Sequence, residues 1–419
     1  MDPYANLDAW RRARKSLDVR LYLYVHLLEF HEKQVAIWMA TFTLFCSAVA
    51  FLSSNAQLKV LAWSIDGFVL GVFLYRLVGR QDDTRIQPPV EIAHSADVHI
   101  NESVLEQTHK ANDTSTWQGA WDNSNERIRR IHRHLAPAAA FLRDALQVKL
   151  QEDKDFRNES KVGLCSLPSA SPALFKRVDY YTAFLTNGLY RDRIVYSLHG
   201  TELPVQVVPR NWACADLSES ELANHIGITV LVLDREKKLL LGKPSKKAQT
   251  IYGVLAPIGN GSLDVDDIVF DAQERMDIRA TLVKGTTREF IEEGLSFATH
   301  PRTPINNALR ERVRSEVTES STYIGFWQWL SQGYKPEFVF ISQTSADWSD
   351  FTPAPDEMLA DRENVFPQIR SLSDIDDAWA WAKSNEIRVS VPLYAALSLL
   401  SRHWTHQPIR KAIGSAWKI

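Results

Sequence analysis

The feature that most constrains this 419-residue chain is the stretch 35–52, which contains no charged side chain. As an α-helix it would be roughly 27 Å long, close to the thickness of the hydrocarbon core of a bilayer. After a short polar break, a second apolar stretch, 58–78, carries Lys59 and Arg76 near its ends, where long basic side chains reach lipid headgroups. The two stretches predict a transmembrane hairpin over residues 35–80. A buried helical hairpin in a soluble domain is the alternative.

The charges around this hairpin predict its orientation. Basic residues precede and follow the hairpin, whereas the region around its turn has only Lys59, near the start of the second stretch. By the positive-inside rule both termini are cytoplasmic, and we expect a multi-pass protein of the bacterial inner (plasma) membrane, with the lipid bilayer as a partner. Residues 1–34 predict an amphipathic helix. Asp66 in the second stretch is expected either to line a pore or form an oligomer contact, or to be a carboxylate that is protonated or tolerated near the interface.

Composition argues against several classes of function. The formal net charge of −3 gives no sign of a basic surface, so no nucleic-acid partner is expected. The three cysteines, Cys46, Cys165 and Cys214, are far apart and form no CxxC pair. Their spacing argues against a disulfide framework and a zinc site, and it favours a reducing compartment.

The middle of the chain has the weakest patterns. We expect a cytoplasmic linker and a helix over 81–160, because 81–125 is polar with little periodicity. Apolar residues then recur at helical spacing over 126–150, and Pro137 should kink that helix. The segment 161–224 is aromatic-rich in part and is expected to pack, as an extension, on a last domain at 225–419.

Strand patterns begin in this last domain. Residues 228–233 form a β-branched, apolar run, 234–238 a charged turn and 239–243 an apolar return, which together predict a hairpin. A further strand is expected at 252–255. It leads into a turn containing Gly259 and Gly261, where glycine permits close approach of the backbone to a ligand. Lys243, at the end of the hairpin, is either a phosphate contact or an ordinary surface lysine.

A helix predicted at 280–293 follows the glycine turn. Its residues Glu289, Glu292 and Glu293 stand at i, i+3 and i+4, which places three carboxylates on one face, while Phe290 points into the core. Such a face is either solvated surface or an all-oxygen site that suits Mg²⁺ or Mn²⁺. The order of hairpin, glycine turn and carboxylate helix favours the metal site.

Residues 288–293, Arg-Glu-Phe-Ile-Glu-Glu, resemble the centre of the Nudix box, Gly-x5-Glu-x7-Arg-Glu-U-x-Glu-Glu-x-Gly-U, where U is a bulky apolar residue. The resemblance covers about 225–345 and implies an α+β fold with a mixed sheet between helices. It implies that Glu289, Glu292 and Glu293 bind the metal and that Arg288 orients one of them. Catalysis would then depend on Arg288, Glu292 and Glu293, and a nucleotide or nucleoside-diphosphate derivative would be bound near Gly259, Gly261 and Lys243.

The sequence also departs from this box. Gly294 follows Glu293 directly, one residue early, and the upstream Gly-x5-Glu is replaced by Gly261-x5-Asp267. Residues 268–287 then fill a spacing for which the family has seven positions. The general base is not defined by the pattern; Glu337, Asp356 and Glu357 are candidates.

Three functions fit these features. The first is a Nudix-type pyrophosphohydrolase that cleaves a nucleoside-diphosphate-linked compound. The second is a nucleotide-sensing membrane effector, similar in architecture to those of bacterial antiviral (phage-defence) systems. In it the hairpin acts as a homo-oligomer, because two spans per chain cannot enclose a pore. The third is a housekeeping Nudix enzyme that the hairpin merely tethers to the membrane.

Overall fold

The structure is a computed structural model, and the chain forms a mixed α+β fold. It describes residues 84–87, 92–113, 117–135, five positions between 142 and 149, 157–198, 201–244, 254–294, 304–347, 358–359, 369, 372–405 and 409. The amphipathic helix predicted at 1–34 and the hairpin predicted at 35–80 lie outside these residues. Among the residues described, none of the helices combines the length and the apolar character needed to cross a bilayer.

The chain is organised in two compact units, the first made of 1–87, 129–151 and 193–207 and the second of 88–128, 152–192 and 208–419. The first unit contains an antiparallel sheet of order β1-β6-β7, with strands Thr84–Gln87, Arg193–Leu198 and Thr201–Val205. Helix α6 (Glu126–Leu135) spans the boundary between the units in sequence. It covers the first part of the helix predicted at 126–150, and Pro137 lies outside the described residues.

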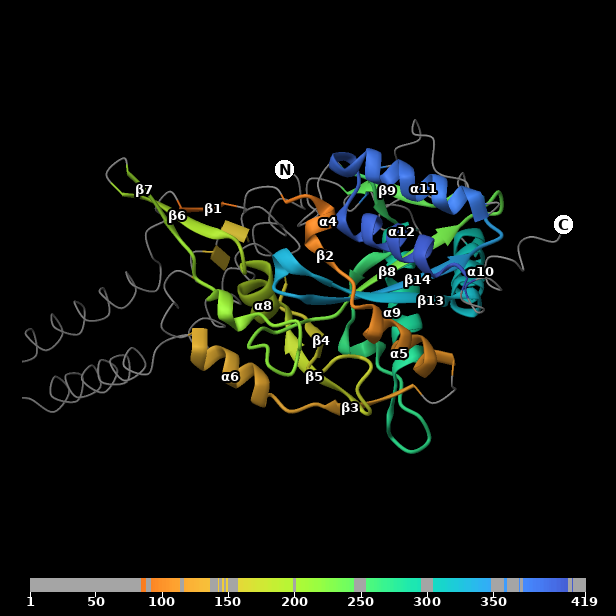
Figure 1. The fold of residues 1–419 in the computed structure, drawn as a ribbon. Coiled ribbons are helices and arrows are strands. Elements are labelled where there is room, and N and C mark those ends of the chain that lie inside the picture. The colour runs from red at the N-terminus through yellow and green to blue at the C-terminus, as the bar shows by residue number, and fades with distance from the viewer. Residues whose placement is uncertain are drawn as a thin grey trace, which may run out of the picture. The chain divides into compact units, whose positions relative to one another are not determined.

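A five-stranded mixed sheet organises the second unit (Figure 1). Its order is β11 (Asn260–Ser262), β8 (Gly227–Leu233), β14 (Lys335–Gln343), β13 (Thr322–Trp329) and β2 (Val98–His99). β8 and β14 are parallel, and the other neighbours are antiparallel. Every residue of β8 is buried, as its continuous apolar run predicts for a strand covered on both faces. The strand predicted at 228–233 is thereby confirmed.

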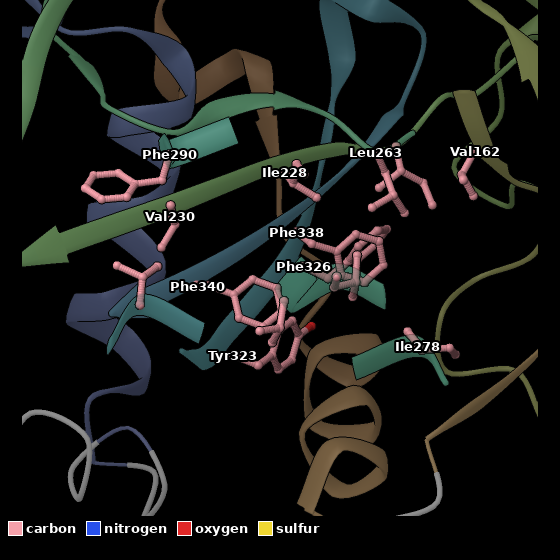
Figure 2. Packing of buried hydrophobic residues seen from close by; sticks show 14 of the residues in the cluster. Val162, Ile228, Val230, Leu263, Ile278, Phe290, Tyr323, Phe326, Phe338 and Phe340 are labelled. Carbon is pink, nitrogen blue, oxygen red and sulfur yellow. The ribbon is translucent and has the colours of Figure 1, made fainter. Parts of the chain in front are cut away.

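Helices cover both faces of this sheet. Alternate residues of β8 point to opposite faces: Ile228 and Val230 belong to one apolar core, and Leu231 belongs to the other. The first core includes Phe290 of α9 (Ile278–Gly294) and two valines of α10 (Pro304–Ser320), and Figure 2 shows several of its members. The second core takes its helical residues largely from α11 (Leu372–Ser384) and α12 (Val391–His403). The helix predicted at 280–293 is present as α9.

A second sheet has the order β12-β3-β5-β4. Its strands are Met276–Asp277, Gln118–Asp122, Ala173–Asp179 and Ser160–Leu164. β4 also joins the central sheet, because the Val162 amide donates to the Leu263 carbonyl and the Ile226 amide donates to the Val162 carbonyl. Val162 and Leu263 lie close together in Figure 2. The extra residues between the glycine turn and α9 include β12, which pairs with β3 of this second sheet.

The predicted hairpin around 234–238 is present. Asp234 and Lys238 close the turn, and the Leu240 amide returns to the Val232 carbonyl. The return continues into β9 (Leu241–Pro244), which lies between β10 (Ala256–Pro257) and β15 (Met358–Leu359). Of the strand predicted at 252–255, Leu255 forms an isolated β-bridge with Val389 and β10 follows at Ala256, while 251–253 lie outside the described residues.

The segment 81–125, expected to be a linker, contains regular structure. It forms α4 (His94–Asp97), β2, α5 (Glu102–Asp113) and β3. The buried side of α5 combines the apolar Val104 and Leu105 with polar Thr108, His109 and Asn112. Because polar residues share the buried face, the apolar periodicity that would predict this helix is weak. The remaining short elements of the described chain are α8 (Tyr180–Ala183), η3 (Phe184–Gly188), η4 (Arg210–Trp212), η5 (Val265–Asp267), η6 (Leu330–Gln332) and η8 (Glu386–Arg388).

Candidate functional site

The glycine turn and helix α9 meet in direct contact. Phe290 is fully buried beneath the helix, which fixes the rotation of α9 over β8 and β11. Gly259 has φ +94°, a conformation that favours glycine, and a Cβ at Gly261 would overlap the Glu289 carboxyl group. A Cβ at Gly285 would lie 2.6 Å from Leu263 Cδ1. Glycine at these positions lets the helix lie directly against the turn.

Backbone amides of the turn bind two of the three predicted carboxylates. The Gly259 and Asn260 amides donate to Glu293 Oε2 at 2.7 and 3.1 Å. The Ser262 amide donates to Glu289 Oε1 at 3.1 Å. The fold thus brings the turn at Gly259 and Gly261 against the carboxylate helix, and the turn amides contact the helix itself. Its contact with a ligand stays a prediction.

Arg288 ties the turn to the helix. Its guanidinium donates to Asp267 at 2.9–3.2 Å and to the Ser262 carbonyl at 2.9 Å, and it forms an ion pair with Asp264 at 3.2 Å. Asp267 is 2 % exposed. In the comparison with the box, Asp267 stands at the upstream glutamate position; both of its carboxylate oxygens accept from Arg288, and Oδ2 also accepts from the Asp264 amide.

The same guanidinium holds two carboxylates of its own helix. Arg288 Nη1 donates to Glu289 Oε1 at 3.1 Å and to Glu292 Oε2 at 3.0 Å. The Glu292 side chain is half exposed, whereas that of Glu289 is only 12 % exposed. The orienting role that the resemblance implies for Arg288 therefore matches its contacts, which reach Glu289 and Glu292 together.

A further cation enters from the second sheet. Lys161 on β4 is buried, and its ammonium donates to Asp264 Oδ1 at 2.5 Å and to Glu159 at 2.9 Å. Neither Lys161 nor Asp264 was predicted to belong to the site. Lys161 lies about a hundred positions from the glycine turn, and a single lysine in a strand has no local pattern that marks it.

Burial and charge set the electrostatics of this network. Burial raises the pKa of Glu289 to about 7, although Arg288 and Lys161 oppose the rise. Burial also raises the pKa of Asp264, against the pull of Lys161 and Arg288. For Arg288, burial alone would lower the pKa, but hydrogen bonds and charges from Asp267 and Glu289 raise it overall. Arg288 is therefore a permanent cation among carboxylates that the interior tends to neutralise.

The three predicted metal ligands are drawn apart in this arrangement. Glu289 and Glu292 turn toward Arg288, and Glu293 turns toward the Gly259 and Asn260 amides. Across the described part of the chain, no three His, Cys, Asp or Glu side chains already converge as a metal site would require. The predicted binding of Mg²⁺ or Mn²⁺ by these glutamates stays a prediction.

Two other predicted positions lie elsewhere. Lys243 is on β9, paired through its backbone with Leu359, in a different sheet from β11. Glu337 is buried on β14 in an ion pair with Lys335. The next residue, Phe338, packs in the core beneath α9. Because neighbouring residues of a strand point to opposite faces, the Glu337 side chain points to the other face of the sheet. That direction argues against Glu337 as a base beside Glu289; the candidates at 356 and 357 lie outside the described residues.

Comparison with known proteins adds no relative. No protein-family model matches the chain, and no curated protein matches it either.

Proposed function

We propose that the chain is a membrane-anchored protein with a Nudix-type domain that binds a divalent cation and hydrolyses a nucleoside-diphosphate-linked compound. One observation carries the proposal: helix α9 presents Glu289 and Glu293 to the glycine turn, and Arg288 holds Glu289 together with the half-exposed Glu292. The mixed sheet between two helical layers supports the same assignment.

The donor set fits Mg²⁺ or Mn²⁺. Every candidate ligand is a carboxylate oxygen, and hard divalent cations prefer such oxygens. Among the described residues, the ion-pair network that joins Asp264, Asp267, Glu289 and Glu292 contains two cations, Arg288 and Lys161. Negative charge is therefore in excess, and burial already disfavours the charge of Glu289. When bound by Glu289, Glu292 and Glu293, the ion would offset the charge of the substrate phosphates.

The chain's own residues have defined parts in this proposal. Arg288 holds the Glu289 and Glu292 side chains by a forked contact, which limits their rotation. The half-exposed Glu292 gives the site its access to solvent. The turn at Gly259 and Gly261 brings backbone close to the carboxylates, where a nucleotide would lie, and Lys243 on β9 is proposed to contact its phosphates.

Hydrolysis by the purified full-length chain tests the proposal. A panel of dinucleotides and nucleotide sugars would be incubated with Mg²⁺ or Mn²⁺ and the release of nucleoside monophosphate measured. We expect turnover by the wild type and a fall in kcat of about 100-fold or more in Glu292→Gln and Glu293→Gln, because each variant removes a proposed ligand. Glu311→Gln on α10 is the control, since Glu311 is an exposed partner of Arg314. Turnover equal in all variants would refute the assignment.

A second candidate is a nucleotide-sensing membrane effector whose domain binds its ligand without cleaving it. One observation favours it: Arg288 and the turn amides donate to all three glutamates, so each carboxylate already has hydrogen-bond partners within the protein. A vesicle leakage assay with the full chain, with and without nucleotides, distinguishes the candidates. Ligand-dependent leakage or oligomerisation without turnover supports sensing. Replacing residues 35–80 with an unrelated membrane anchor then separates sensing from simple tethering. Function should be preserved in the replaced protein if the hairpin only tethers the domain, and lost if the hairpin takes part in signalling.

A further inference from the structure

We propose that Lys161 on β4 is a positioning residue of the carboxylate site, acting through Asp264 and Arg288. The inference rests on the proposed function, because the site that Lys161 would position is the one assigned above. It also gives the 157–192 segment a part in that site, beyond packing against the last domain.

The first support is the burial and direction of the Lys161 side chain. Lysine normally extends its ammonium into water, but the Lys161 side chain is 7 % exposed and ends between Asp264 and Glu159. The ring of Tyr180 lies 5.6 Å from its ammonium. Burial alone would lower the pKa of Lys161, yet the charges of Asp264 and Glu159 raise it overall. The side chain is therefore a buried cation aimed at the turn.

The second support is the backbone that brings it there. Lys161 forms a β-bridge with Asp264, and the Val162 amide donates to the Leu263 carbonyl. The Leu263 amide in turn donates to Ile226, just before β8. β4 thus holds the segment that follows the glycine turn by both backbone and side chain.

The third support is the position of Asp264 between two cations. Its Oδ1 accepts from Lys161 and its Oδ2 lies 3.2 Å from Arg288 Nη2. The Asp264 amide also donates to Asp267, so the two carboxylates lie close together. Without Lys161, Arg288 alone would have to offset Asp264 and Asp267 as well as its own helix glutamates. We therefore expect the turn to shift, and the amides that hold Glu289 and Glu293 to lose those contacts part of the time.

Hydrogen exchange of the full-length chain tests this inference without a known substrate. In Lys161→Met we expect amide exchange over 259–262 to accelerate by about 10-fold or more, while β8 stays protected, because only the local opening changes. Lys161→Arg should remain near the wild type, since it keeps the charge. Lys176→Met is the matched control: Lys176 lies on the neighbouring strand β5 and pairs with Asp122 at 3.7 Å.

Two exchange results would overturn the inference. One is unchanged exchange over 259–262 in Lys161→Met. The other is equal acceleration over 259–262 and β8, which would indicate general destabilisation. Mn²⁺ titration of the same proteins separates this inference from the proposed function. Affinity about 10-fold weaker in Lys161→Met, restored by Lys161→Arg, supports positioning, and wild-type affinity in Lys161→Met contradicts it. No Mn²⁺ binding by the wild type would refute the proposed function itself, while the exchange pattern still decides whether Lys161 orders the turn.

Discussion

Two glutamates of the central sheet region, the partly buried Glu289 and the buried Glu337, have similar packing and different surroundings. Glu289 lies against Gly261 of β11, and Glu337 lies against Gly227 of β8; in each case a Cβ on the glycine would overlap the carboxyl group. They lie on opposite faces of the sheet, since Glu289 is on α9 and Glu337 points away from the α9 core. Burial raises the pKa of both carboxyl groups.

The difference lies in how each charge is balanced. Glu337 is 2 % exposed and pairs with Lys335, one cation for one carboxylate. Glu289 shares Arg288 with Asp264, Asp267 and the half-exposed Glu292. The buried Lys335–Glu337 pair has equal positive and negative charge and does not require another ion. The cluster around Arg288 has more carboxylates than cations and is partly exposed to solvent, so it can bind a further cation. Burial of a carboxylate alone therefore does not distinguish structure from function; the local charge balance and access to solvent do.

The largest expected effect is a loss of stability when the buried Lys335–Glu337 pair is broken. Lys335→Met leaves the Glu337 carboxylate buried without its cation, which should cost about 3–5 kcal/mol in the free energy of unfolding. Removing both charges in Lys335→Met/Glu337→Leu should restore most of this stability, because neither buried charge remains. Chemical denaturation measures both values. A cost below about 1 kcal/mol for the single variant would show that the pair is not closed.

A pH dependence is expected from the open cluster. The pKa of Glu289 is raised from its ordinary 4.5 to about 7, so its folded form holds a proton more readily than its unfolded form. The raised pKa of Glu289 therefore adds about 3 kcal/mol to the free energy of unfolding below pH 4.5, and this stabilisation is lost as the pH rises through 7. Relative to Glu289→Gln, the wild type should thus lose stability between pH 5 and pH 8 in denaturant titrations. Parallel profiles would contradict the burial of this charge.

The smallest expected effect is the loss of stability when alanine replaces Gly227 or Gly261. Gly227→Ala should cost about 2–3 kcal/mol, since Glu337 is enclosed, and Gly261→Ala about 1–2 kcal/mol, since Glu289 has Glu292 and solvent on one side. Gly188→Ala serves as a control, because its Cβ would approach only the Phe184 ring, at 3.1 Å. Thermal denaturation gives the order. The reverse order would mean that the Glu289 side of the sheet is the more tightly closed.

Much of the last domain follows from local patterns. The strand at 228–233 was predictable because a short β-branched run that ends at a charged turn favours a buried strand, and α9 was predictable because its apolar residues and glutamates recur at helical spacing. Helical geometry alone also assigned Phe290 to the buried face of α9 and the neighbouring carboxylates to another face. The contact between Arg288 and its i+4 partner Glu292 is likewise a local property.

What local patterns missed depends on distant partners. Lys161 reaches Asp264 only because β4 joins β11 and β8, and no short-range spacing encodes that meeting. α5 was missed because Thr108 and His109 share its buried face with Leu105. The insertion before α9 carries no strand signal of its own: β12 has two residues and exists through its pairing with β3.

Divalent-cation binding by the Arg288-centred cluster is the central claim, and calorimetric titration of the full-length chain with Mn²⁺ tests it most directly. We predict binding by the wild type and by Glu311→Gln, and affinity at least about 10-fold weaker in Glu292→Gln and Glu293→Gln. The Lys335–Glu337 pair should have no effect on Mn²⁺ affinity, so Lys335→Met/Glu337→Leu should bind Mn²⁺ as the wild type does. Failure of the wild type to bind Mn²⁺, or equal affinity in all five proteins, would contradict the account.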